Sequence, residues 1–249
     1  MHKTIIQLVI AILLISTGFS SAQTTNLSPK EILEESDYAR GNIEGIKWII
    51  HIESIEKNRK QTRSLKVSAR GANSLAEMIA PSRVKGRKLL MLDRNMWFIK
   101  PGLRKPVPIS PRQKLLGGAS NGDIASTNYA GDYTIADITE DKIGQEPCYC
   151  YDLVAAKKNA TYDRIRYWVS KKRHVGVKSD FFTTSGKLYK SATFEYNHSI
   201  TIGNRQLPFV SRMVIRNAIV KNDVTVMSYH DIKIKKIPDA TFNLNLLMQ

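Results

Sequence analysis

The chain has 249 residues, 38 Lys and Arg against 22 Asp and Glu, and a formal net charge of +16 at pH 7. This length suits one sizeable domain or two small ones. The excess of positive charge indicates an anionic partner such as nucleic acid, phospholipid headgroups or an acidic protein. Two cysteines are too few for a disulfide-rich scaffold.

The first residues predict export. Lys3 precedes an apolar run over residues 5–15, and residues 20–22 (Ser-Ser-Ala) are small enough for signal peptidase cleavage. This pattern predicts a signal peptide over residues 1–22, cleaved after Ala22, and a mature single domain over residues 23–249. An uncleaved N-terminal anchor is the alternative, but the apolar run is short for a membrane span. Export argues against nucleic acid and leaves membrane surfaces and lipid phosphates as partners.

A helix is expected directly after the signal peptide. Ser28 suits the N-cap, Pro29 the first helical position, and Glu31 completes a capping box with Ser28. Gly41 is suited to end this helix in a left-handed conformation.

The rest of the mature chain is rich in short apolar or alternating runs, which predict strands. Trp48, Ile50 and Ile52 alternate with polar neighbours, and a hairpin is expected around Gly144. Strands are predicted near residues 48–52, 61–69, 78–80, 88–92, 96–100, 134–138, 148–154, 165–169, 188–196, 213–215 and 224–226. Frequent turns and missing helical crossovers favour a mainly β chain with helices, built as an antiparallel barrel or sandwich.

Residues 101–130 interrupt this pattern. Prolines stand at positions 101, 106, 108 and 111, and short helices are expected at 113–116 and 124–129. A long connection without strands is typical of a lid or binding loop.

A basic and apolar stretch precedes and enters this connection. Its cations crowd between residues 83 and 114, with Asp93 as the only acid, and they alternate with the apolar runs 89–92 and 96–99. This combination suits a partner that is both apolar and anionic, such as a lipid.

Two features suggest a catalytic serine and a disulfide, but the sequence context favours neither. Residues 118–122 match the G-x-S-x-G pattern with Ser120 as nucleophile, but no buried strand and helix flank it, and His174, His198 and His230 are scattered. Cys148 and Cys150 occupy one face of a predicted strand, where an unstrained disulfide does not fit. They are interpreted as buried free thiols or as a strained bridge. No metal-ligand spacing is found.

Several motifs identify a family resemblance. They are GRKLLMLD at residues 86–93, MWF at 96–98, IRYWVS at 165–170, SGKL at 185–188 and IPDATF at 237–242. With these motifs the mature chain resembles exported bacterial outer-membrane lipoprotein-sorting proteins, relatives of the LolA and LppX-like carriers. The resemblance implies an α+β fold, a half-open antiparallel β-barrel with an N-terminal helix and a helical or loop lid. It implies acyl-chain binding in an apolar concavity, with no enzyme activity, metal or cofactor.

The candidate residues follow from this resemblance and from strand parity, the rule that every second residue of a strand faces the same side. Acyl-chain contacts are expected from inward-facing apolar residues: Trp48, Ile50, Ile52, Leu90, Trp97, Ile99, Phe194, Tyr196 and Met213, with Leu115 and Leu116 in the lid. Contacts to lipid phosphates or an acidic partner are expected from basic residues: Arg87, Lys88, Arg104, Lys105 and Arg112.

The expected function is that of a periplasmic carrier that takes a lipid or lipoprotein toward the outer membrane. A monomer is expected, with peripheral membrane contact, and with an inner-membrane transporter and an outer-membrane acceptor as partners. Each shielded methylene contributes about 0.8 kcal/mol, so one acyl chain contributes on the order of 10 kcal/mol, and release needs a handover surface or an opening lid. Two alternatives stay open: an adaptor of an inner-membrane lipid exporter that holds no cargo, and a lipid hydrolase using Ser120.

Overall fold

The computed structural model describes residues 27–248, so the expected signal peptide lies outside the described range. The first half of that range contains α1 (Pro29–Tyr38), β1 (Ile46–Glu56), β2 (Arg59–Arg70), β3 (Asn73–Ala80), η1 (Ser82–Val84), β4 (Lys88–Leu92), β5 (Asn95–Ile99), β6 (Val107–Ile109), β7 (Lys114–Leu116), β8 (Ala119–Ser120), η2 (Asn121–Ile124) and α2 (Tyr129–Asp132). The second half contains β9 (Tyr133–Ile143), β10 (Glu146–Ala155), β11 (Arg164–Ser170), β12 (Gly176–Phe182), β13 (Leu188–Glu195), β14 (His198–Ile202), β15 (Arg205–Phe209), β16 (Arg212–Asn217), β17 (Val224–Ile234), η3 (Asp239–Phe242) and η4 (Leu246–Met248).

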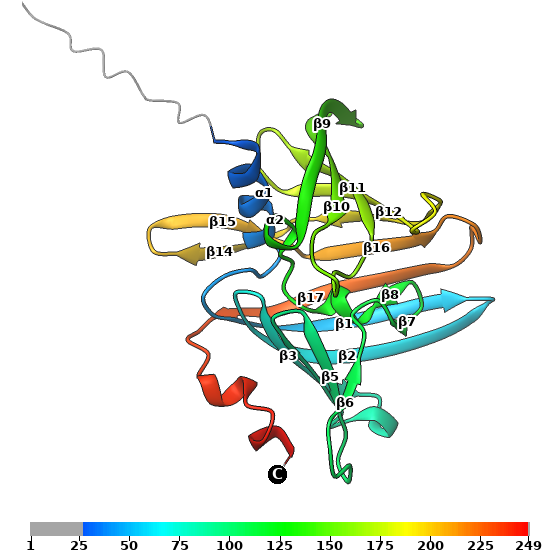
Figure 1. Cartoon of the computed structure of the whole chain (residues 1–249), viewed down its shortest axis with the longest axis vertical. Helices are drawn as coiled ribbons and strands as arrows, with labels where there is room; N and C mark the ends of the chain where they lie inside the picture. Colours follow the sequence, from blue (N-terminus) through cyan, green and yellow to red (C-terminus); the bar gives the residue numbers. More distant parts are fainter. Residues whose placement is uncertain (1–26, 249) are drawn as a thin grey trace, which may run out of the picture.

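One antiparallel sheet of 13 strands organises the molecule (Figure 1), in the order β6-β5-β4-β3-β2-β1-β17-β16-β13-β12-β11-β10-β9. The sheet is not closed, and β6 and β9 are its two edges. The strand pairs β14–β15 and β7–β8 form two further small sheets that are not part of it. The expectation of a mainly β chain with a half-open antiparallel barrel and helices is therefore confirmed.

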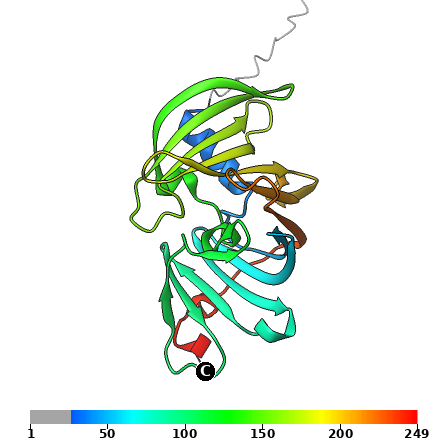
Figure 2. The same cartoon turned by 90° about the vertical axis from the view of Figure 1, so that its right-hand side faces the viewer.

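Among the strands of the main sheet, the two edge strands, β6 and β9, follow one another in sequence. Figure 2 shows β9–β12 at one end of the molecule and β3–β6 at the other, with the chain that joins them running between. That chain, residues 110–132, contains β7, β8, η2 and α2 and is called the insert below. It carries the chain from one free edge of the sheet to the other.

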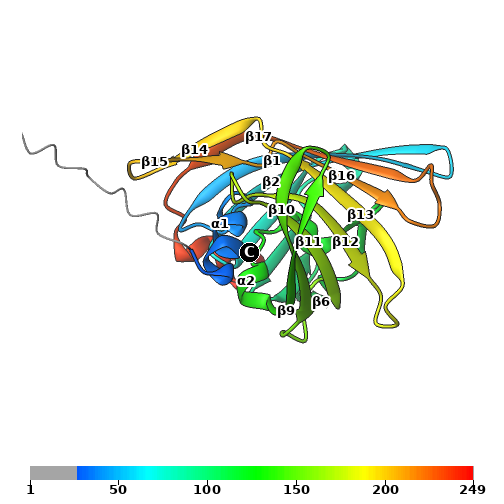
Figure 3. The same cartoon turned by 90° about the horizontal axis from the view of Figure 1, so that it is seen from above.

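The predicted first helix is confirmed. In α1, Ser28 Oγ accepts from the backbone N–H of Glu31, whose carboxylate accepts in turn from the backbone N–H of Ser28. The helix ends at Tyr38, and Gly41 follows with φ +97°. α1 lies beside α2 of the insert (Figure 3).

Strand pairing follows the alternation of apolar residues in sequence. Ile50 on β1 lies opposite Leu65 on β2 and Tyr229 on β17, and all three side chains are buried. The hairpin predicted around Gly144 joins β9 to β10, and this glycine has φ +63°.

The expectation for residues 101–130 is wrong in its details. This segment contains β6, β7 and β8, and residues 114–116 are a strand rather than part of a helix. The helix expected at 124–129 is replaced by η2 before it and α2 after it. Elements of two to four residues depend on partners distant in sequence, and periodicity cannot identify such short elements.

Candidate functional site

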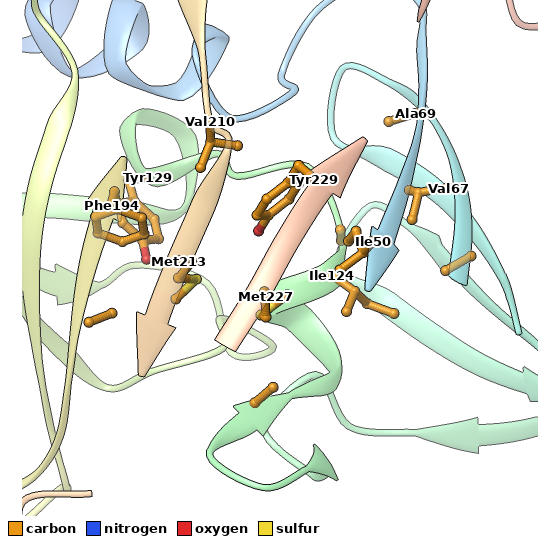
Figure 4. Close-up of a cluster of buried hydrophobic side chains, with 14 of the residues drawn as sticks. Ile50, Val67, Ala69, Ile124, Tyr129, Phe194, Val210, Met213, Met227 and Tyr229 are labelled. Atoms are coloured by element: carbon orange, nitrogen blue, oxygen red, sulfur yellow. The ribbon is translucent and has the colours of Figure 1, made fainter. Parts of the chain in front are cut away.

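The insert fills the inner face of the sheet. Leu116, Ala119, Ile124 and Tyr129 of the insert are buried in the main hydrophobic cluster. In Figure 4, Ile124 lies near Ile50 of β1, and Tyr129 lies beside Phe194 of β13, with the side chains of β16 and β17 between them. The apolar surface that the open sheet would otherwise expose is thus covered by the chain's own residues.

Most of the predicted acyl-contact residues lie in this cluster. The buried members are Trp48, Ile50, Ile52, Leu116, Phe194 and Met213, and the partly buried residues packed against them are Leu115 and Tyr196. Phe194 and Met213 are direct neighbours across β13 and β16. Strand parity therefore brings residues from β1, β13 and β16 together with the insert.

Strand parity fails for Leu90, Trp97 and Ile99. These three residues belong to a second hydrophobic cluster, on the opposite face of the sheet, which is covered by Ile237 and Phe242 near the C-terminus. The neighbours of Leu90 in β4, at positions 89 and 91, are in the main cluster, and successive side chains of a strand point to opposite faces. The expectation that Leu90, Trp97 and Ile99 share a face with Trp48 is wrong.

Buried polar contacts hold the first part of the insert. Lys190 Nζ on β13 donates to Gly118 O at 2.7 Å and to Ser120 Oγ at 3.2 Å, and it lies 3.4 Å from Asp123 Oδ2. Asp123 also accepts from Tyr162 Oη at 2.6 Å. Burial lowers the pKa of Lys190, and the neighbouring Asp123 carboxylate opposes that shift.

A second set of polar contacts holds the last part of the insert. Asp37 on α1 accepts from the backbone N–H of Ala130 at 2.9 Å, and its other carboxylate oxygen is buried without a partner. Burial raises the pKa of Asp37 to about 7. Arg94 and Asp132 form a buried ion pair at 2.8 Å.

Between these two sets lie an arginine and a pair of serines. The Arg40 guanidinium lies 4.5 Å from the ring centroid of Phe194 and 5.3 Å from that of Tyr129. Ser126 Oγ lies 3.3 Å from Ser74 Oγ on β3. Sequence analysis missed these buried polar residues because single charged residues look like ordinary surface positions; only the tertiary structure places them inside.

Charged and polar residues make up most of the lining of the surface hollows near the insert. One of about 270 Å³ is lined by residues that include Glu56, Lys114, Ser120 and Lys190. A neighbouring hollow of about 480 Å³ is lined by Glu56, Lys57, Arg59, Gln61, Lys114 and Asp223. Sites for apolar ligands are mostly lined by hydrophobic side chains, and on the inner face such side chains are packed against the insert.

Ser120 ends the two-residue strand β8, which lies outside the main sheet, whereas a hydrolase nucleophile elbow follows a strand of a large α/β sheet. It is the N-cap of the short helix η2, and its backbone N–H donates to Asp123 Oδ2 at 2.8 Å. Lys190 donates to the same hydroxyl while facing two further oxygen acceptors, which favours the ammonium form rather than a free base. His174 and His198 have other partners, Glu35 and the carbonyl of Tyr229.

The predicted anion-contact residues divide into two groups. Arg87 and Lys88 lie at the start of β4, and Arg104 and Lys105 lie in the turn between β5 and β6. Arg112 is separate: it forms an ion pair with Asp163 and donates to Ala160 O at 2.9 Å. Its charge is already neutralised by a carboxylate of the chain.

The two cysteines are free thiols, which is one of the two alternatives that their spacing left open. Cys148 and Cys150 pack with Trp168 and Val177 in a small cluster of their own. Within residues 27–248, no three His, Cys, Asp or Glu side chains are grouped so that they could hold a metal ion. No helix in that same range has the length and hydropathy needed to cross a membrane.

A family model with the description "uncharacterized protein" matches residues 71–249. A LolA superfamily protein from Nitrosomonas europaea is similar, with 26% identity and a TM-score of 0.78 over 88% of this chain and 99% of its own. A putative outer membrane lipoprotein-sorting protein domain from Vibrio parahaemolyticus has 16% identity and a TM-score of 0.74, over 88% of this chain and 98% of its own. A DUF1329 family protein from Desulfovibrio piger has 19% identity and a TM-score of 0.71, over 88% of this chain and 97% of its own. None of the curated proteins matches the sequence.

Proposed function

We propose, from the premise that this chain belongs to the family matched over residues 71–249 and has the LolA-superfamily fold, that it is a periplasmic carrier of acyl chains. Its residues 23–249 form one carrier domain that takes a lipid or lipoprotein toward the outer membrane without covalent chemistry. The observation that carries the proposal is the insert, one chain segment that covers the apolar inner face of an unclosed sheet.

The contacts that anchor the insert are of a kind that allows it to move away from the inner face of the sheet. Its buried anchors include two ion pairs, Lys190 with Asp123 and Arg94 with Asp132. A buried ion pair gives little net stability, because its charges lose their hydration, although it fixes one geometry. When the insert moves out, these charges regain water, and an acyl chain replaces its apolar contacts. At about 0.8 kcal/mol per methylene, a long chain offsets on the order of 10 kcal/mol of lost packing.

A disulfide that fixes the insert tests this proposal. Ser74 on β3 and Ser126 in the insert have their hydroxyl oxygens 3.3 Å apart, so Ser74→Cys/Ser126→Cys places two thiols within reach of each other. The reduced protein is expected to bind a fluorescent long-chain fatty acid, and the oxidised protein is expected not to. Adding reductant should restore binding.

A matched control keeps a disulfide but leaves the insert free. Thr139 on the edge strand β9 lies opposite Cys150 on β10, so Thr139→Cys offers a similar bridge away from the insert. Its oxidised form is expected to bind the fatty acid normally. Equal binding by both redox forms of the Ser74/Ser126 variant would exclude the inner face as the binding site.

The two alternatives give different results. A cargo-free adaptor would bind no fatty acid in either redox state, and native mass spectrometry of the protein from the periplasm would find it consistently without lipid. A hydrolase would lose ester hydrolysis in Ser120→Ala. The carrier is expected to show no hydrolysis, and Ser120→Ala should still bind the fatty acid.

A further inference from the structure

One end of the molecule collects seven basic residues from segments that are separate in sequence. They come from η1 and the turn after it, from the start of β4, and from the turn between β5 and β6: Arg83, Lys85, Arg87, Lys88, Lys100, Arg104 and Lys105. These segments lie at the lower end of the molecule in both Figure 1 and Figure 2, together with the C-terminal helix η4. This group is called the basic pole.

The segments of the basic pole touch one another. A hollow of about 320 Å³ is lined by Lys88, Lys100, Leu103, Leu247 and Met248, together with Gly86, Ile99, Pro101 and Gly102. A Cβ placed on Gly86 would lie 3.6 Å from Pro101 Cγ. Lys88 of β4, Lys100 directly after β5 and apolar residues from the C-terminal segment therefore border one concavity.

The cations of the basic pole form no ion pairs within the described residues, although Glu77 stands opposite Lys88 across the β3–β4 pair. None of the seven side chains takes part in the ion pairs found over residues 27–248, although other cations such as Arg70, Lys114 and Arg173 do. The pKa of Arg63 is lowered first by burial and then by the charges of Arg83 and Arg87. Like charges held this close repel one another, and an anionic surface would relieve that repulsion.

Apolar side chains stand among these cations. Val107 on the edge strand β6 is 43% exposed and Leu246 on η4 is 49% exposed, while Leu103 at the tip of the β5–β6 turn is half-buried. Exposed apolar residues beside Lys and Arg suit the boundary between headgroups and acyl chains. An acidic protein would satisfy the cations but would not require apolar residues at the tip of a turn.

We propose that the basic pole is a docking surface for membranes that contain anionic phospholipids. Lys100, Arg104 and Lys105 meet the headgroup phosphates, and Leu103 and Val107 enter the interfacial region. Juxtamembrane cations attract an anionic leaflet within about a Debye length, so the contact is reversible and depends on salt. This docking does not depend on cargo in the interior, so it can be tested separately from the carrier function.

Vesicle binding by the purified protein tests the proposal. Vesicles of phosphatidylcholine alone are compared with vesicles that also contain phosphatidylglycerol, by co-sedimentation at low and high salt. The protein is expected to bind the anionic vesicles at low salt and to be released at high salt. Lys100→Glu/Arg104→Glu/Lys105→Glu is expected to weaken binding by on the order of 100-fold, since each cation contributes a similar share of the attraction.

The control variant has the same change in net charge at other turns. Lys172, Lys187 and Lys221 are exposed and lie in the β11–β12, β12–β13 and β16–β17 turns. Lys172→Glu/Lys187→Glu/Lys221→Glu is expected to bind anionic vesicles nearly as well as the unaltered protein. An equal loss in both triple variants would mean attraction by overall charge and would overturn the proposal.

The apolar part of the basic pole has its own variant. Leu103→Asp/Val107→Asp is expected to weaken binding to anionic vesicles even at the salt concentration where the unaltered protein binds best. Thermal unfolding of each variant checks that the fold persists, since all substituted side chains except Leu103 are exposed. If the unaltered protein binds neither vesicle type, the membrane proposal is wrong.

Discussion

Lys190 Nζ on β13 lies 3.4 Å from Asp123 Oδ2 in the insert, and the two side chains are only 5% and 3% exposed. The pair joins the sheet to the segment that covers its inner face. Lys190 also donates to the carbonyl of Gly118, so one ammonium group contacts the insert at two places.

Removing one member of this pair should destabilise the protein strongly. Lys190→Met leaves the buried Asp123 carboxylate without its countercharge, and such losses cost about 3–5 kcal/mol. Denaturant unfolding measures the change. Lys190→Met/Asp123→Asn, which has no unpaired charge, is expected to recover part of it. Lys187→Met, at an exposed position next to β13, is the control and should change the unfolding free energy by less than about 0.5 kcal/mol.

The buried carboxyl of Asp37 should make stability depend on pH. Burial raises its pKa in the folded protein from 3.8 to about 7. Below the unfolded value both states are protonated, and burial has no ionic cost. As pH rises toward 7 the unfolded state loses its proton first, so folding becomes less favourable, and the full cost applies above 7. Asp37→Asn should therefore gain stability relative to the unaltered protein between pH 4 and 7, by on the order of 4 kcal/mol.

The difference between the two unfolding free energies isolates Asp37 from all other titrating groups. Glu34→Gln, on the same helix and with its side chain 41% exposed, is the control substitution. A difference between Asp37→Asn and the unaltered protein that stays constant from pH 4 to 8 would contradict the raised pKa.

Two glycines with similar backbone angles should respond differently to alanine. Gly117 in the insert has φ +57° and Gly144 has φ +63°, so alanine at either position costs about 1–2 kcal/mol from backbone strain. A Cβ on Gly117 would also overlap the hydroxyls of Ser54 and Thr225, whereas nothing lies within 4 Å of one on Gly144. Gly117→Ala should therefore cost about 1–3 kcal/mol more. Equal losses on thermal unfolding would mean that the β7–β8 turn yields freely.

The two thiols should be unreactive in the folded protein. Cys148 and Cys150 are buried, and burial raises the pKa of both thiols, so little thiolate is present at pH 8. A coloured disulfide reagent is expected to react slowly with native protein and to titrate two thiols after unfolding. Ser185→Cys, in an exposed turn, should add one rapidly reacting thiol. Fewer than two thiols after unfolding would reveal a bridge.

Local sequence signals predicted those elements whose residues satisfy one another nearby. The capping box of Ser28 and Glu31 acts within four residues, and Trp48, Ile50 and Ile52 alternate along a strand with one core-facing side. Such patterns are readable without knowing the fold. They located α1, most strands and the cluster on the inner face.

The predictions failed where both sides of an element are covered. Residues 89–92 are all apolar because β4 packs against the main cluster on one face and against the C-terminal segment on the other. No polar residue in such a strand marks which face is exposed. The alternation therefore assigns Leu90, Trp97 and Ile99 to the wrong face of the sheet. The buried anchors Asp37 and Lys190 were missed for a related reason: an isolated charge shows no burial in sequence.

The insert lies in sequence between β6 and β9, the two edge strands of the main sheet. Because the insert is the covalent link between the free edges of the sheet, its coiled path through the interior sets how far those edges can separate. Twenty-three residues reach on the order of 75 Å when extended, but far less while they are folded inside. We therefore expect that widening the gap between the edges draws the insert out of the interior. A partner bound to either edge strand would then move the insert as well.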